Sequence, residues 1–189
     1  MAASSKKYHQ LTDEELVNGI VQNKDEQMFA ELYDRYADII YSKGFHFIHA
    51  EEETRDATHD IFVKLFLKLN TYKGQSKFST WLYAFVYHFY VNYVQRKLNK
   101  EKELFVAADE DLKKQVLVSD EQIYTLKSDK LAAALDQLDA DDKAILLMKY
   151  QDDFTIKELQ EVFEIGESAV KMRLNRAKSR VIEKYNALS

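Results

Sequence analysis

The side chains with the clearest chemistry are a group of cations near the C-terminal end of the chain. Six Lys or Arg residues and one Glu lie between Lys171 and Lys184, whereas the whole chain has a formal net charge of -5. Basic charge gathered in this way can neutralise phosphates and release their counterions. A polar neighbour such as Asn175 can read base edges. The pattern therefore indicates non-covalent recognition of a polyanion. The cations are Lys171, Arg173, Arg176, Lys178, Arg180 and Lys184.

Two short helices around a tight turn must position these cations. Thr155 and Glu158 form a capping box that starts the first helix, and Gly166 supplies a permissive backbone in the turn. This helix-turn-helix pattern, together with the charge, indicates that the second helix binds DNA. The alternatives are an amphipathic helix that faces only solvent, or one that binds a membrane surface or a calmodulin-like partner. The second helix carries one apolar stripe, formed by Val170, Leu174, Ala177 and Val181.

A second unusual feature is a run of aromatic residues, nine in the 22 residues from Tyr72 to Tyr93. A helix with rings on every side cannot bury all of them in a small bundle. We expect Leu82, Phe85 and Phe89 to lie in the core and some of the other rings to be exposed. Unpaired bases stack on exposed rings for about 1–3 kcal/mol each. Nearby cations that could hold a nucleic-acid backbone are Lys73, Lys77, Arg96 and Lys97.

The composition indicates an all-α protein with two small helical domains joined by a flexible linker. The chain has no proline and only four glycines, so helices can continue for long stretches. It has no cysteine, which excludes disulfides and thiolate chemistry. Apolar periodicity is dense to about Val94 and again from Leu131, with a polar segment between. The predicted boundaries are 1–98, 99–127 for the linker, and 128–189.

Several helix ends can be predicted. Thr12 and Glu15 form a capping box for a short first helix. A second helix should start near Asp25 and end at Gly44. A third should run from about Glu51 to Asn70, a fourth from Ser79 or Thr80 to about Lys97, and Asp139 should cap a helix before the helix-turn-helix. The chain has no apolar run of membrane-spanning length and no apolar signal core, so we expect a cytoplasmic protein without membrane insertion.

Two blocks of this sequence resemble the extracytoplasmic-function sigma factors, which are promoter-specificity subunits of bacterial RNA polymerase. The first block contains DATHDIFVKLF and FSTWLYAFVYHF, and the second is AILLMKYQDDFTIKELQEVFEIGESAVKMRLNRAKSRV. The resemblance covers roughly Gln27 to Lys97 and Leu131 to Lys184. It implies that the first domain binds the polymerase core and melts the promoter near the start site, while the second reads the upstream element. It also implies no enzymatic activity, no cofactor, and three partners: core polymerase, promoter DNA and an anti-sigma factor.

The resemblance assigns polymerase binding to the predicted third helix. Its acidic start suits the helix dipole and can pair with cations of a partner, although an acidic solvated face would look the same. The family usually has Gln and Glu where this chain has His59 and Asp60. The implied polymerase contacts are Asp56, His59, Asp60, Phe62, Val63 and Phe66.

The aromatic segment corresponds to the family's strand-separating element. Its loop from Tyr72 to Phe78 matches the loop that captures a base flipped out of the non-template strand, and His88 stands where the family most often has Asn. The implied downstream contacts are Tyr72, Lys73, Gly74, Lys77, Phe78, Trp81, His88, Asn92 and Arg96.

The family's upstream-element reader corresponds to Glu167–Arg180. Here the resemblance implies that Ser168, Lys171, Met172 and Asn175 face bases, and that Arg173, Arg176 and Lys178 contact phosphate.

Two other classes of function are weighed against this one. His46 and His49, with His59 and Asp60, could in principle bind a metal, but scattered surface histidines are commoner, and the chain has no Gly-rich phosphate loop or nucleophile elbow. A stand-alone helix-turn-helix regulator would bind a palindromic operator tightly as a dimer. An acidic chain with one basic helix lacks the field for such binding, so the sigma interpretation is preferred.

Overall fold

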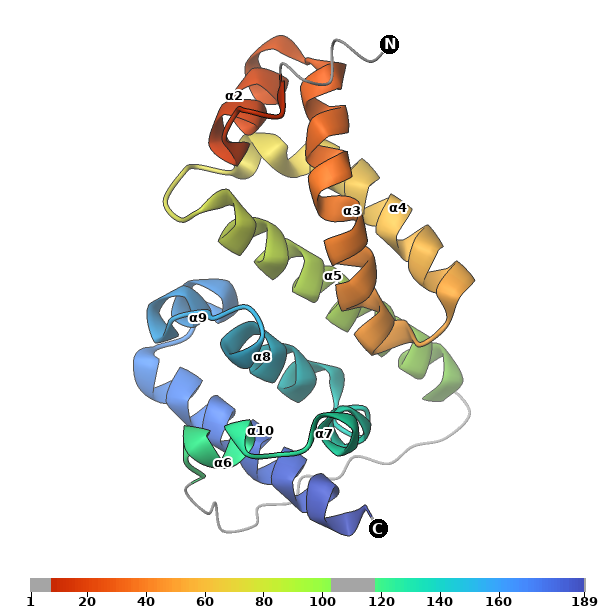
Figure 1. Ribbon diagram of the computed structural model, residues 1–189, viewed down its shortest axis with the longest axis vertical. Coiled ribbons are helices and arrows are strands. Elements are labelled where there is room, and N and C mark those ends of the chain that lie inside the picture. The colour runs from red at the N-terminus through yellow and green to blue at the C-terminus, as the bar shows by residue number, and fades with distance from the viewer. Residues whose placement is uncertain (1–7, 103–117, 189) are drawn as a thin grey trace. The chain divides into compact units, whose positions relative to one another are not determined.

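The computed structural model describes residues 8–102 and 118–188 and shows helices without strands in those ranges (Figure 1). The chain divides into two compact units, Met1–Tyr90 and Val91–Ser189, with the division inside helix α5. The prediction of an all-α fold with two helical domains is confirmed. No helix in the described ranges is long and apolar enough to cross a membrane. The helices are α2 (Asp13–Asn23), α3 (Glu26–Ile48), α4 (Glu51–Lys68), η1 (Leu69–Thr71), α5 (Phe78–Lys102), α6 (Asp120–Tyr124), α7 (Ser128–Leu135), α8 (Ala140–Tyr150), α9 (Ile156–Phe163) and α10 (Glu167–Ala187).

The linker predicted for 99–127 is described only at its two ends, because residues 103–117 lie outside the described ranges. Helix α5 extends into its beginning. Its last part is folded: Val118 and Ile123 are buried, and Ser119 forms a capping box with Gln122 at the start of α6. Two buried apolar side chains thus help to hold this polar segment on the second unit.

The core of the first unit lies where α2, α3, α4 and α5 pack together. Helix α5 turns Leu82, Val86 and Tyr90 inward at intervals of four residues, and all three are fully buried. Phe85 and Phe89, which were expected in the core, lie on the flank of this stripe and are only half-buried. That expectation was correct for Leu82 alone, because a helix that is apolar on all sides does not reveal which side faces inward.

Helix α3 continues past Gly44 to Ile48, so the predicted end at Gly44 was wrong. The left-handed residue that ends the helix is His49, with φ of 57°. Gly44 has a different purpose, because a Cβ placed there would lie 2.2 Å from the hydroxyl oxygen of Tyr90. The glycine permits the close approach of α3 to the buried ring of Tyr90.

The residues before α2 are anchored on α3 through Arg35. Its guanidinium donates to Asp13 at 2.8 Å, to Glu31 at 2.9 Å and to the carbonyl oxygen of Tyr8 at 3.1 Å. Burial raises the pKa of Glu31, but hydrogen bonds from Arg35 and His9 outweigh it, so the pKa is lowered overall. The capping box predicted for Thr12 is present and starts α2 beneath this network.

In the second unit, α10 packs against α7, α8 and α9. The side chains of 144–148 on α8 are buried, and so is the predicted apolar stripe of α10. Asp139 caps α8 by accepting from the backbone N–H of Asp142 at 2.8 Å, as predicted. The sequence therefore places the supporting helix correctly behind the helix-turn-helix.

The turn of the helix-turn-helix differs from its prediction. Thr155 and Glu158 form the expected capping box at the start of α9. The left-handed residue in the turn is Glu164, with φ of 53°, whereas Gly166 has φ of -69° and is the N-cap of α10. Gly166 therefore has an extended backbone that other residues can also adopt, so the permissive backbone expected of it in the turn is not used.

Candidate nucleic-acid and protein interfaces

The first two turns of α10 present the most accessible polar surface of the helix-turn-helix. Ser168, Lys171 and Met172 are exposed, with Met172 at 58%. The ammonium of Lys171 lies 2.5 Å from a carboxylate oxygen of Glu167, one turn earlier, and both side chains face solvent. An exposed i,i+4 pair of this kind contributes little stability, so phosphate can compete for the lysine.

The arginines of α10 are ion-paired with the beginning of α8. Arg173 donates to Asp141 at 2.7 Å and lies 4.3 Å from the ring centroid of Phe163. Arg176 donates to Asp142 at 3.4 Å, and Arg180 also donates to that fully buried carboxylate. These contacts hold α10 on α8. A phosphate that met Arg173 or Arg176 would have to compete with an aspartate.

Two further residues that were expected to contact DNA face the protein itself. Lys178 is 9% exposed and donates to the carbonyl oxygen of Val118 at 2.5 Å and to Asp120 at 2.9 Å. The side-chain oxygen of Asn175 accepts from the N–H of Val118 at 3.1 Å. In this structure Lys178 is therefore a buried anchor, not an accessible phosphate contact.

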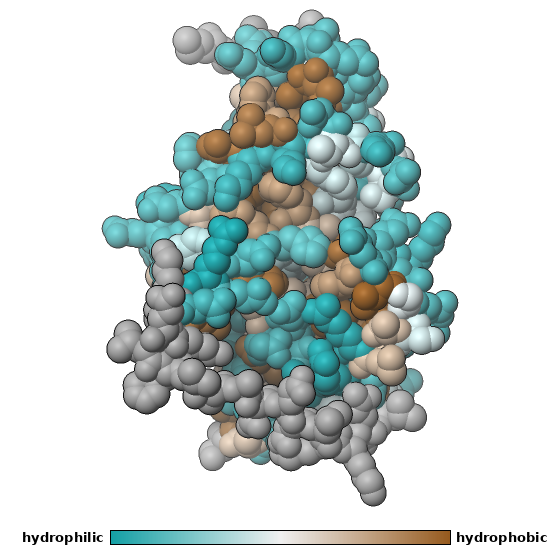
Figure 2. Space-filling model, turned by 180° about the vertical axis from the view of Figure 1, so that it is seen from behind, coloured by the Kyte–Doolittle hydropathy of each residue, from teal (hydrophilic) through white to brown (hydrophobic). Residues whose placement is uncertain are grey.

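One face of α4 combines acidic and apolar side chains. Asp56, Asp60 and Val63 follow one another at helical spacing and are exposed, and Leu67 continues the row with 70% of its surface exposed. His59 and Phe66 lie beside the row and are exposed as well. Apolar side chains also reach the surface among hydrophilic ones in Figure 2. A partner with cations and an apolar patch would match this face of α4.

Phe62 does not belong to that exposed face. It is 3% exposed, and its ring centroid lies 6.4 Å from that of Phe29 and 4.3 Å from that of Tyr33. Phe62 therefore packs in the core of the first unit, and the polymerase contact expected of it stays a prediction. Leu67, in contrast, was missed, although its spacing from Asp60 and Val63 could have identified it.

Helix α5 carries an aromatic and polar row along its outer face. Trp81 and Phe85 are half-buried and stacked, with ring centroids 6.0 Å apart and planes at 11°. His88 follows at helical spacing and is exposed, and the same helical row continues to Asn92 and Arg96, which are also exposed. The structure thus adds Phe85 to the surface rings on which a base could stack.

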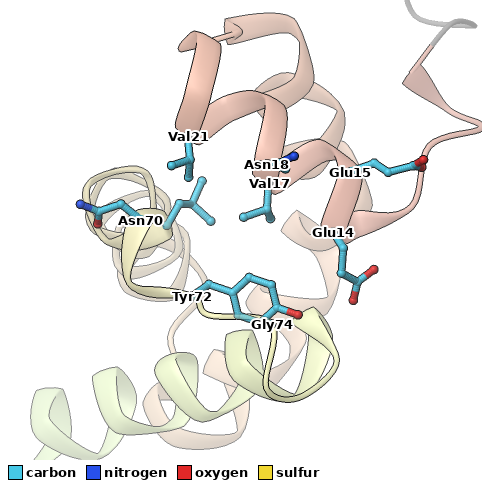
Figure 3. A pocket seen from close by; sticks show the side chains of 9 residues that line it. Glu14, Glu15, Val17, Asn18, Val21, Asn70, Tyr72 and Gly74 are labelled. Atoms are coloured by element: carbon cyan, nitrogen blue, oxygen red, sulfur yellow. The ribbon is translucent and has the colours of Figure 1, made fainter.

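A cavity of about 450 Å³ lies between α2 and the loop that precedes α5 (Figure 3). Gly74 gives this loop a left-handed turn, with φ of 67°. The Tyr72 hydroxyl donates to the carbonyl oxygen of Ser76 at 2.6 Å, and burial raises the pKa of that hydroxyl. Phe78, at the end of the loop, is fully buried. The lining residues are Glu14, Glu15, Val17, Asn18, Val21, Leu69, Asn70, Tyr72 and Gly74.

The loop is fixed to α2 through Glu14, whose carboxylate accepts from the backbone N–H of Phe78 at 3.1 Å. This bond satisfies a donor at the start of α5. Sequence reasoning identified the loop side of the cavity through Tyr72 and Gly74. It missed the α2 side, because Glu14 and Phe78 are 64 residues apart.

The histidines considered for metal binding belong to no cluster of three or more ligands in the part of the chain that the structure describes. Across 8–102 and 118–188, no group of three or more His, Asp or Glu side chains is arranged to hold a metal ion.

Comparisons with known proteins match both units. The family described as "Sigma-70 region 2" matches residues 32–99, and "Sigma-70, region 4" matches residues 128–181. The chain is 24% identical over 167 residues to the ECF RNA polymerase sigma factor SigX of Bacillus subtilis (strain 168), covering 86% of each chain. It is 24% identical over 166 residues to SigW of the same organism, covering 84% of this chain and 89% of SigW.

A solved structure of similar fold is that of CnrH in complex with the cytosolic domain of CnrY. The similarity has a TM-score of 0.63 at 17% sequence identity and covers 94% of this chain and 99% of that one. A second is the sigma factor RpoE in complex with the anti-sigma factor NepR from Bartonella quintana, with a TM-score of 0.58 at 15% identity, covering 85% of this chain and 98% of that chain.

Proposed function

This chain belongs to the extracytoplasmic-function group of sigma factors and contains sigma-70 regions 2 and 4. We propose that it is an alternative sigma factor that binds bacterial core RNA polymerase and directs initiation at its own set of promoters. The observation that carries this proposal is the presence of three different surfaces on one chain. These are the acidic and apolar face of α4, the aromatic row of α5 and the exposed first turns of α10. A sigma factor needs all three, whereas a stand-alone regulator has no use for the first two.

The upstream promoter element is read by the first turns of α10. Ser168, Lys171 and Met172 are accessible there, so a polar side chain, a cation and an apolar side chain can meet base edges and phosphate together. The arginines further along keep the helix seated on α8 and add to the local positive potential.

The downstream element is melted by the loop before α5 and by the outer row of that helix. Extruding a base costs a few kcal/mol, which stacking on a ring at about 1–3 kcal/mol can offset. Trp81 and Phe85 form a ready stack, and Tyr72 lies 5.6 Å from Trp81 between their ring centroids. Melting thus depends on binding energy, and Asn92 and Arg96 would contact the separated strand beyond the rings.

The polymerase core binds the exposed row of α4. Asp56 and Asp60 supply negative charge for cations of the core. The apolar contact comes from three residues that are 42–70% exposed, namely Val63, Phe66 and Leu67. An anti-sigma factor is the second expected protein partner, since the similar solved structures of CnrH and RpoE are complexes with the cytosolic domain of CnrY and with NepR, respectively. Such a partner would act by covering one or more of these three surfaces.

The test is run-off transcription with purified core polymerase on genomic DNA, with and without this chain, followed by mapping of the RNA start sites. New starts that share a two-block upstream motif are expected. The variant Lys171→Gln should weaken initiation at those starts, and Leu67→Asp should weaken capture of the core. If the chain yields no new starts and does not pull down the core, the sigma function is rejected and a stand-alone regulator takes its place.

A further inference from the structure

The segment 118–124, called here the strap, is hydrogen-bonded to α10. The backbone N–H of Val118 donates to Asn175, and the carbonyl oxygen of the same residue accepts from Lys178. A single residue of the strap, Val118, is therefore hydrogen-bonded to two side chains that lie one turn apart on α10. Both are side chains whose chemistry would otherwise suit DNA.

Three further residues anchor the strap. The carboxylate of Asp120 accepts from Lys178 at 2.9 Å and from the hydroxyl of Tyr150 at 2.6 Å. The side chain of Ile123 is 6% exposed, and the ring of Tyr124 packs edge-on against that of Tyr150 with centroids 5.6 Å apart. The strap is thus held by charge, hydrogen bonds and apolar burial together.

The burial of Lys178 makes this arrangement exclusive. Its ammonium has three N–H donors, and the strap accepts from it through two oxygen atoms. A lysine that is 9% exposed cannot also reach a phosphate, and it could leave the strap only by exchanging both acceptors for others. DNA and the strap are alternative partners for the same cation.

We propose that the strap is an intramolecular competitor of DNA on α10. While it is bound, DNA contact is limited to the first turns with Ser168, Lys171 and Met172. When it detaches, Asn175 and Lys178 are released, and the DNA-binding surface extends along the helix. The inference rests on the proposed function of α10 as a DNA reader, and it makes this segment of the predicted linker a regulator of that reader.

The bound state is tested by lysine labelling of the full chain with an amine-acetylating reagent, followed by mass spectrometry. Lys178 should react at about one tenth of the rate of Lys171 or less, because the strap must open before the reagent can reach it. Ile123→Asp, which removes the apolar anchor, should raise the rate at Lys178. Glu121→Gln alters an exposed side chain of the same segment that makes no anchoring contact in the described part of the chain, and it is the control. Equal labelling of Lys171 and Lys178 in the unaltered chain would overturn the inference.

The competition is tested by the salt dependence of binding of the full chain to a fluorescein-labelled duplex of random sequence. Lys171→Gln should reduce the slope of log K against log salt by about 0.9, the value for one phosphate contact. Lys178→Gln should leave the slope unchanged. Ile123→Asp, or the milder Val118→Pro, which removes the N–H donor, should increase the slope by about 0.9, and adding Lys178→Gln should cancel the increase.

The variants separate the two hypotheses. If Lys178→Gln alone reduces the slope as Lys171→Gln does, the strap does not compete with DNA and the inference fails, while the DNA-binding role of α10 stands. If Lys171→Gln has no effect, the proposed role of α10 itself fails. Circular dichroism of each variant establishes that the helices remain folded, and Val118→Pro serves if Ile123→Asp does not fold.

Discussion

At Gly44 a single missing methyl group lets α3 lie against a buried tyrosine. We expect Gly44→Ala to lower the free energy of unfolding by about 1–3 kcal/mol, because the added Cβ would lie 2.2 Å from the Tyr90 hydroxyl oxygen, and the fully buried ring cannot move aside. Urea unfolding followed by circular dichroism measures the change. Gly19→Ala is the control, since its Cβ meets only the flexible end of Met28 and a helical alanine is favourable. Equal effects at both glycines would contradict this explanation.

Phe85 is the residue whose role changes most between sequence and structure. Phe85→Ala should weaken promoter opening by about 1–3 kcal/mol, the contribution of one stacked base, whereas Phe85→Tyr should retain it. Permanganate reactivity of unpaired thymines in complexes with core polymerase reports the opening. Should Phe85→Ala open promoters as well as the unaltered chain, only Trp81 and Tyr72 would remain as stacking candidates.

The limits of sequence reasoning at this scale are clear from the cations of α10. The charge run correctly singled out one helix, because charge and helical spacing are local properties. The partners of Arg173 and Arg180 lie 32 and 41 residues earlier in the chain, at Asp141 and Asp139. Only the fold brings those groups together, so sequence alone could not distinguish cations that hold the helix from cations that are open to DNA.

At the scale of the element, the exposed row of α4 makes a prediction about polymerase binding. Leu67→Asp should reduce the affinity for core polymerase at least about tenfold, because a charge would replace a 70% exposed apolar side chain of the proposed interface. Lys68→Gln, an exposed change outside the row, is the control. Affinity is measured by fluorescence anisotropy of the labelled chain titrated with core. Phe62→Ala should lower stability as well, since that ring is buried.

The α6 element gives a pH-dependent prediction. Hydrogen bonds from Tyr150 and Lys178 lower the pKa of Asp120 below the ordinary aspartate value of 3.8. Because the folded pKa is the lower one, the stabilisation is complete above 3.8 and is lost as the pH falls through the folded value. Asp120→Asn should therefore reduce the free energy of unfolding at neutral pH, and the difference from the unaltered chain should shrink in acid. A constant difference across that range would show that the carboxylate charge is irrelevant.

Helix types and starts were predictable, whereas some ends and faces were not. Capping boxes at Thr12 and Thr155 lie within four residues of chain, so the sequence contains all the information needed. The end of α3 was misjudged because Gly44 serves tertiary packing instead of a helix end. The orientation of α5 was misjudged because its apolar residues surround it, and only the packing of α3 and α4 decides that Tyr87 and Tyr90 face inward.

At the scale of the whole molecule, the two proposed DNA-reading surfaces draw on both units of one chain: the exposed turns of α10 lie in the second unit, and the rings Tyr72, Trp81 and Phe85 lie in the first. Each surface alone should bind weakly. The first turns of α10 have few accessible side chains, and the stacking energy at α5 is offset by the cost of melting the DNA. Joining them converts the second binding event into an intramolecular one, and linkage of this kind can raise affinity by about 10²–10⁴. The two-domain organisation that the sequence predicted is therefore the property on which promoter selection should depend most.

This dependence can be measured by separating the units. Fragments 1–102 and 118–188 contain the described residues of the two parts, and each carries a buried core of its own. Mixed in equal amounts with core polymerase, they should direct far less run-off transcription than the intact chain, by roughly the 10²–10⁴ that linkage provides. Circular dichroism and thermal unfolding of each fragment are the controls, because an unfolded fragment would give the same loss for a trivial reason. If two folded fragments together matched the intact chain, the upstream and downstream readers would act independently, and the covalent connection would contribute nothing to promoter recognition.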